Sequence, residues 1–78
     1  MTVYFFDRSE DDEFYRGDYG MEFANVDEAY REALRALAEI ARDELLTGNH
    51  RELAIHIRED GGSCILRASL TLRMERPS

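Results

Sequence analysis

The chain has 78 residues and a net charge of −7 at pH 7, with 17 acidic and 10 basic side chains. This length allows one domain with a small core, and the lone cysteine excludes an intramolecular disulfide that could stabilise it. The acidity argues against nucleic-acid binding, because affinity for phosphate comes mainly from positive charge.

Extended segments are predicted before the middle of the chain. Residues 2–7 form an apolar run of valine and aromatic side chains, which is typical of a strand. Residues 8–13 are mostly charged and are expected to form a turn. A second extended segment over residues 13–23 is expected to be interrupted, because Gly17 and Gly20 favour a bulge or a break.

One long amphipathic helix is predicted over residues 26–47. Apolar side chains recur there at steps of three and four, and charged side chains occupy the opposite side. Asn25 is a capping residue, and Glu28 follows it at the spacing of a capping box. Gly48 is a natural C-terminal stop, so both ends of the helix are marked.

The last third of the chain has the pattern of a β-hairpin. Residues 51–60 and 63–75 alternate apolar and polar side chains. A two-residue turn at Gly61-Gly62 would place Ile57 opposite Leu66 and would set every apolar side chain opposite another. The turn and the hydrophobic pattern therefore predict the same register.

These elements predict a single small α+β domain over residues 1–78. The expected architecture is a two-layer ββαββ fold with a four-stranded, mainly antiparallel sheet and the long helix on one face. Such a helix covers one face only, so the other face of the sheet is expected to be bare. Small domains without disulfides or metals often self-associate, which makes a homodimer an expectation from the start.

The bare sheet face is the candidate interaction surface. The predicted register places His56 opposite Arg67 and Arg58 opposite Ile65 on this face. The first strand is aromatic on both sides, so it adds further apolar surface there whichever side meets the helix. Two interpretations stay open: scattered exposed apolar groups of the ordinary kind, or a dimer or partner interface. The candidate residues are Phe5, His56, Arg58, Ile65 and Arg67.

No complete catalytic or metal-binding set is present. The acidic segment from Asp7 to Glu13 alternates oxygen ligands like a calcium loop but lacks the required glycine and glutamate. The spacing of His50 and His56 matches no common zinc pattern, and Cys64 has no histidine placed beside it by the register. We therefore expect no metal, no cofactor and no enzymatic activity.

A small enzyme or ligand-binding domain is the alternative from another class. It would need a pocket between the helix and the first strand, or across a dimer seam. The side chains that could serve such a pocket are Tyr4, Tyr15, Tyr19, His56 and Asp18.

The location and the partners are also expectations from composition. No apolar run approaches the roughly 20 residues needed to cross a membrane, and the first residues lack the features of a signal peptide. We expect a cytoplasmic protein that forms a homodimer or binds a protein partner, with no nucleic acid and no membrane.

Four segments spread over nearly the whole chain resemble a family of small uncharacterised bacterial proteins, a domain of unknown function. The resemblance implies a small soluble bacterial domain and carries no known activity and no functional residues. The segments are Tyr4-Phe5-Phe6-Asp7, Asp18-Tyr19-Gly20-Met21-Glu22, Glu32-Ala33-Leu34-Arg35-Ala36-Leu37-Ala38 and Glu52-Leu53-Ala54-Ile55 with its following glycine turn.

A second likeness, of shape, is to the N-terminal half of HicB-like antitoxins. Those domains begin with an extended hairpin followed by an acidic, alanine-rich helix. The likeness implies a module that neutralises a partner in a toxin–antitoxin pair. The chain departs from the pattern because it has a complete second hairpin and no appended DNA-binding segment.

Overall fold

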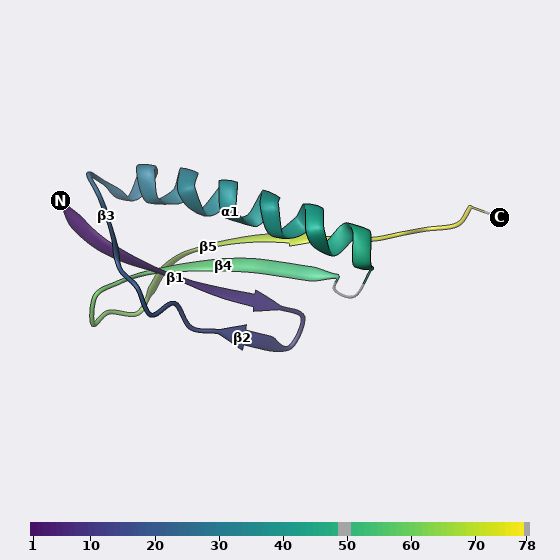
Figure 1. The fold of residues 1–78 in the computed structure, drawn as a ribbon, viewed down its shortest axis with the longest axis horizontal. Helices are drawn as coiled ribbons and strands as arrows, with labels where there is room; N and C mark the ends of the chain where they lie inside the picture. The colour runs from purple at the N-terminus through teal and green to yellow at the C-terminus, as the bar shows by residue number, and fades with distance from the viewer. Residues whose placement is uncertain (49–50, 78) are drawn as a thin grey trace.

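The structure is a computed structural model that describes residues 1–48 and 51–77, so His50 lies outside the described residues. One helix packs on a mostly antiparallel, open sheet of five strands, which confirms the predicted α+β class (Figure 1). The elements are β1 (Thr2–Glu10), β2 (Glu13–Tyr15), β3 (Met21–Phe23), α1 (Val26–Thr47), β4 (Glu52–Glu59) and β5 (Cys64–Thr71).

The five strands occupy four positions in the sheet. Their order is β2-β1-β4-β5, and β3 pairs with β1 as well. Tyr4 pairs with Met21 of β3 and with Glu59 of β4, so β3 and β4 lie on opposite edges of β1. The two short strands β2 and β3 therefore share one edge of β1, and β5 forms the other edge of the sheet.

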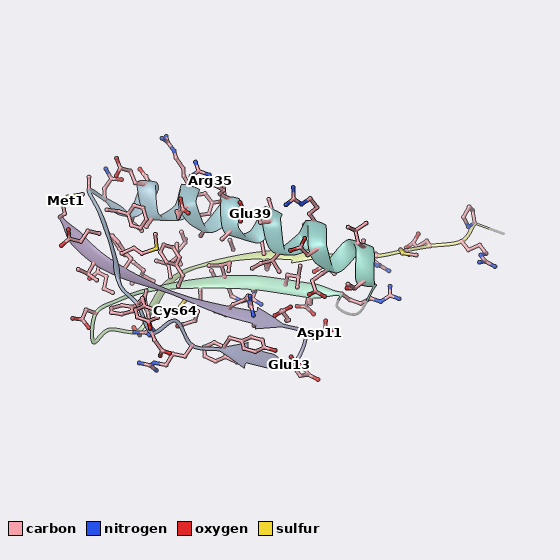
Figure 2. All side chains as sticks on the ribbon, viewed as in Figure 1. Met1, Asp11, Glu13, Arg35, Glu39 and Cys64 are labelled. Carbon is pink, nitrogen blue, oxygen red and sulfur yellow. The ribbon has the colours of Figure 1, made fainter. Side chains whose placement is uncertain are left out.

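The helix begins and ends where its sequence signals predict. The Asn25 side chain accepts a hydrogen bond from the Glu28 backbone N–H at 3.0 Å, and the Glu28 carboxylate accepts one from the Ala24 N–H at 3.2 Å. Gly48 closes the helix in the left-handed region, at φ 68°, and donates its N–H to the Glu44 carbonyl. Arg35 and Glu39 project from the side of α1 that faces away from the sheet (Figure 2).

The core lies between α1 and the strands β1, β4 and β5. Small side chains on the helix allow it to lie close to the sheet: Ala29 and Ala33 are fully buried. Tyr4 belongs to this core and Phe6 packs against it, so Phe5 points to the opposite face of the sheet. The buried residues of the core are Tyr4, Ala29, Ala33, Leu37, Ala41, Leu53, Ile55, Ile57 and Ala68.

The first strand is longer than predicted. It continues through Asp7, Arg8 and Ser9 to Glu10, where a charged turn was expected, and the turn is confined to the two residues before β2. Asp7 and Glu10 are each only 6 % exposed. Local charge density predicts a solvated turn, but these carboxylates have arginine partners within the sheet, so the strand prediction was too short.

The register of the second hairpin is confirmed along most of its length. Ile57 pairs with Leu66, and His56 pairs with Arg67. The prediction that Arg58 faces Ile65 was wrong, because a β-bulge follows Ile57 and places Arg58 opposite Cys64. The turn is also shifted: Gly62 donates its N–H to the Glu59 carbonyl, and Gly61 takes the positive φ of 70°.

The last strand ends earlier than the expected residue 75. β5 stops at Thr71, and Leu72 makes one more bond, from its N–H to the Arg51 carbonyl at 2.7 Å. β4 begins at Glu52, and no strand among the described residues pairs with residues 73–77. These residues continue past the C-terminal end of α1, away from the rest of the molecule (Figure 1).

Asp11 ties the first hairpin to the start of β4. It adopts a left-handed φ of 54°, and its Oδ1 accepts hydrogen bonds from the N–H groups of Arg51 and Glu52, at 3.0 and 2.9 Å. Figure 2 shows Asp11 at the tip of this hairpin. We expect Asp11→Ala to lower the free energy of unfolding by about 1–2 kcal/mol, because both bonds are lost and alanine disfavours this φ.

The matched control is Asp11→Asn, which keeps an acceptor oxygen and tolerates the left-handed region. Urea denaturation of both variants measures the difference. Equal losses for alanine and asparagine would show that the side-chain acceptor does not hold the two segments together.

Candidate interaction surface

The face of the sheet opposite α1, here called the outer face, carries a polar cluster. Strand alternation places Phe5, Asp7 and Ser9 of β1 on this face, because their neighbours Tyr4 and Phe6 meet the helix side. The register sets Phe5 beside Arg58 and Asp7 beside His56. Four of the five predicted surface residues therefore share the outer face: Phe5, His56, Arg58 and Arg67.

Asp7 and Arg58 form the centre of the cluster. Arg58 Nε donates to Asp7 Oδ2 at 2.9 Å, and both side chains are largely buried, 12 % exposed for Arg58 and 8 % for Asp7. The Gly17 N–H donates to Asp7 Oδ1 at 2.8 Å, and Arg58 Nη2 donates to the Gly17 carbonyl at 2.9 Å. The Arg58 guanidinium also lies 4.6 Å from the centre of the Phe5 ring. These contacts fix the position of the Arg58 side chain and pack it against the Phe5 ring.

The segment between β2 and β3 folds against β1 and partly covers the outer face. Gly17 approaches so closely that a Cβ there would lie 2.1 Å from the Phe6 carbonyl oxygen. A Cβ on Gly20 would lie 2.4 Å from the Val3 side chain. Any larger residue at either position would therefore collide with β1, so both positions require glycine. Because this segment lies against the outer face, that face is less exposed than the sequence pattern predicts.

His56 is partly buried and lies beside the pair formed by Asp7 and Arg58. Its Nε2 is 3.2 Å from Ser9 Oγ, a hydrogen bond whose donor depends on the imidazole tautomer. The Phe14 ring packs edge to face against the imidazole, with the two ring centroids 5.8 Å apart. Burial lowers the pKa of His56, the nearby charge of Arg67 lowers it further, and Asp7 acts in the opposite direction.

The lowered pKa of His56 predicts a loss of stability in mild acid. The unfolded chain keeps an ordinary histidine pKa of about 6.5, so it binds more protons than the folded chain just below that pH. The free energy of unfolding should therefore fall as pH drops through about 6.5, and this loss should level off below the folded pKa.

The variant His56→Gln should lack this component. Urea denaturation of the wild type and of His56→Gln at a series of pH values separates the contribution of His56 from that of the carboxylates, which both proteins share. Parallel stability curves for both proteins would contradict the assignment, as would an NMR titration of His56 with a pKa at or above the ordinary value.

Ile65, the fifth predicted surface residue, lies elsewhere. As the extra residue of the bulge, it lines a groove between the first turns of α1 and the hairpin end of β4 and β5. Apolar side chains from both elements line this groove: Val26, Tyr30, Ile65 and Leu66. Asp27 and Glu59 contribute negative charge to it, and Arg67 reaches it as well.

The outer edge of β5 adjoins this groove. In residues 1–48 and 51–77, β5 pairs only with β4, so one side of an eight-residue strand has no ladder partner. Large apolar side chains along this side of the molecule are 38–45 % exposed. They are Val26, Tyr30 and Leu34 of α1, with Ile65 and Leu70 of β5.

The backbone alternation along β5 shows which groups point outward. Leu72 donates its N–H to Arg51, so Leu70 and Ala68, two and four residues earlier, also direct their N–H and C=O groups toward β4. The intervening residues, Arg67, Ser69 and Thr71, direct theirs away from β4. Each offers one donor and one acceptor at the edge of the sheet.

The side chains suggested for an enzyme pocket are not gathered in the groove, which contains none of them. Tyr4 is buried on the helix side of the sheet, whereas His56 lies on the outer face. Tyr19 and Asp18 are exposed in the segment before β3, and Tyr15 stacks against the Arg8 guanidinium at 4.7 Å.

Three further features concern the described residues alone. Cys64 is a free, exposed thiol. No group of three His, Cys, Asp or Glu side chains in the described ranges is arranged to hold a metal ion. Within the same ranges, no helix combines the length and the apolar composition that a membrane crossing needs.

A family model described as a domain of unknown function, DUF6894, matches residues 3–71. The chain belongs to this family. The DUF6894 match begins in β1 and ends at the last residue of β5, so it includes every strand and the helix. The family resemblance inferred from the sequence is thereby confirmed. No match was found among curated proteins or among solved structures.

Proposed function

We propose that this DUF6894 domain is a non-enzymatic interaction module of the bacterial cytoplasm that pairs with a second copy of itself through the outer edge of β5. The single observation that carries the proposal is the unpaired side of β5 within the described chain. Antiparallel pairing across a two-fold axis would join the two sheets into one.

A comparison of the two sheet edges supports β5 over the opposite edge. That opposite edge is divided between β2 and β3, each three residues long and separated by the segment that folds over the outer face. Short, interrupted strands are a common protection against edge pairing. β5 has eight residues, no proline or lysine, and a single charged side chain, Arg67. Apart from its bulge and Arg67, the β5 edge therefore lacks the features that usually prevent edge pairing.

The helix adds a second support. Tyr30 and Leu34, one turn apart, remain 38 % and 41 % exposed on a helix that packs over β4 and β5. Pairing of two β5 strands would bring the helices of the two copies side by side on one face of the joined sheet. Burial of these side chains would enlarge the small core that a 78-residue chain can form.

Sedimentation equilibrium of the wild-type protein tests the proposal. We expect a reversible monomer–dimer equilibrium with the dimer mass approached at micromolar concentration. A monomer mass at every concentration up to the millimolar range would overturn the proposed function.

A further inference from the structure

The side of α1 next to the outer edge of β5 has a surface suited to a second helix. Tyr30, which lines the groove shared with β5, and Leu34, one turn later, are large apolar side chains that remain exposed. Ala38, a further turn along, is also exposed, and its small side chain leaves room for a large one. Asp27 and Arg42 flank these residues with opposite charges. The five residues are here called the seam of α1.

The distance between the two helices of a β5–β5 pair follows from the position of α1 over β4 and β5. Neighbouring strands lie about 4.8 Å apart, so a two-fold axis between two β5 strands sets the two α1 axes about 10 Å apart. Packed helices lie about 8–10 Å apart, and the same two-fold axis makes the two helices antiparallel. A second copy of the chain therefore brings its own helix to packing distance from α1.

The first turns of α1 show which helix residue is level with the middle of β5. Tyr30 and Leu66 line the same groove, and α1 and β5 run in the same direction along the molecule (Figure 1). From there, Leu34 lies about 6 Å farther along the helix, and Ala68 lies about 7 Å farther along the strand. Leu34 is therefore level with Ala68.

The middle of β5 is also where two copies of the strand can pair symmetrically. Outward backbone groups of both copies must meet, so the pair can centre there on Arg67, Ala68 or Ser69. A centre on Arg67 sets two guanidinium groups opposite each other, which is unfavourable. A centre on Ser69 sets the large Leu70 opposite an alanine. A centre on Ala68 instead sets Leu70 opposite the partner's Leu66, and the two leucine pairs form an apolar base beneath the helices.

We propose that the seams of two copies interlock across the two-fold axis in this alanine-centred register of β5. This inference rests on the proposed function. Leu34 then meets the partner's Leu34 on the axis, and Tyr30 packs over the partner's Ala38. Asp27 lies level with the partner's Arg42 and pairs with it, twice in the dimer by symmetry. The seam therefore selects a second copy of this chain and determines its register.

Disulfide cross-linking of introduced cysteines tests the contact on the axis. In a Cys64→Ser background, which removes the native thiol, Leu34→Cys should form a disulfide-linked dimer under mild oxidation. Facing Cα atoms of helices about 10 Å apart lie roughly 5–6 Å from each other, within disulfide range. Arg35→Cys in the same background should not cross-link, because Arg35 projects away from the sheet. Ala38→Cys should not link to itself, since the two copies of this residue lie about 12 Å apart along the helices.

An exchange of charges tests the pairing of Asp27 with the partner's Arg42. Asp27→Arg should weaken dimerisation about tenfold, because symmetry breaks the pair twice and sets like charges together. Asp27→Arg/Arg42→Asp in the same chain should restore the wild-type affinity, measured by sedimentation equilibrium. A cost at the helix N-terminus alone would not be relieved by the second substitution.

The outcomes separate the seam from the strand edge. A wild-type dimer in which Leu34→Cys cross-links no faster than Arg35→Cys, or in which the charge exchange restores nothing, overturns the seam and leaves the β5 edge standing. A protein that stays monomeric at every concentration overturns both the seam and the proposed function.

Discussion

Replacing Asp7 with alanine is expected to lower the free energy of unfolding by about 3–5 kcal/mol, the cost of leaving one charge of a buried pair without its partner. The loss is large against the roughly 4–12 kcal/mol that a domain of this length has in total. The Arg58 guanidinium would remain buried without its carboxylate, and the Gly17 N–H would lose its acceptor. Urea denaturation followed by circular dichroism measures the change.

Two controls distinguish the buried pair from an ordinary surface pair. Arg35→Ala breaks the exposed pair of Arg35 with Glu32 and should cost less than about 0.5 kcal/mol. Asp7→Leu/Arg58→Met removes both charges, so it should be less destabilised than Asp7→Leu alone. If Asp7→Ala were as mild as Arg35→Ala, the cluster on the outer face would not contribute to the stability of the fold.

Proline at Ser69 is expected to abolish dimerisation while the monomer stays folded. The Ser69 N–H points away from β4, so proline removes no bond inside the monomer, and edge strands tolerate proline in this orientation. In the dimer the same substitution removes a central hydrogen bond and sets the ring against the partner strand. Sedimentation velocity should show a monomer with a native circular dichroism spectrum.

Leu70→Pro is the contrasting variant, because the Leu70 N–H points toward β4 and its loss should unfold the domain. Ser69→Ala keeps the backbone donor and should dimerise like the wild type. A folded Ser69→Pro protein that dimerises with unchanged affinity would show that β5 is not the interface.

The helix and the second hairpin could be predicted because their signals are local. The Asn25 and Gly48 caps and the three-to-four spacing of apolar residues determine α1 within one segment. The extension of β1 could not be predicted in this way. Asp7 is compatible with a strand only because Arg58, 51 residues later, is brought beside it by the sheet. The partner of a buried charge is a property of the tertiary structure.

The candidate surface was predicted in part. Alternation set His56, Arg58 and Arg67 on one face but left open which aromatic side of the first strand joins them, and the structure places Phe5 there. The segment that covers this face depends on the close approach of Gly17 to β1, which no local pattern encodes. Ile65 was misplaced by the bulge. Tyr30 and Leu34 matched the core periodicity of α1, and their exposure becomes evident only when the strand order shows that β5 ends the sheet.

The most direct test of the β5 interface is amide hydrogen exchange at Arg67, Ser69 and Thr71 as a function of protein concentration. If two β5 strands pair, these N–H groups exchange rapidly in dilute solution and become protected as the dimer forms. Ala68 and Leu70, which bond to β4, should be protected throughout. Rapid exchange at all three outward amides, at a concentration where sedimentation shows a dimer, would show that the dimer does not form through β5.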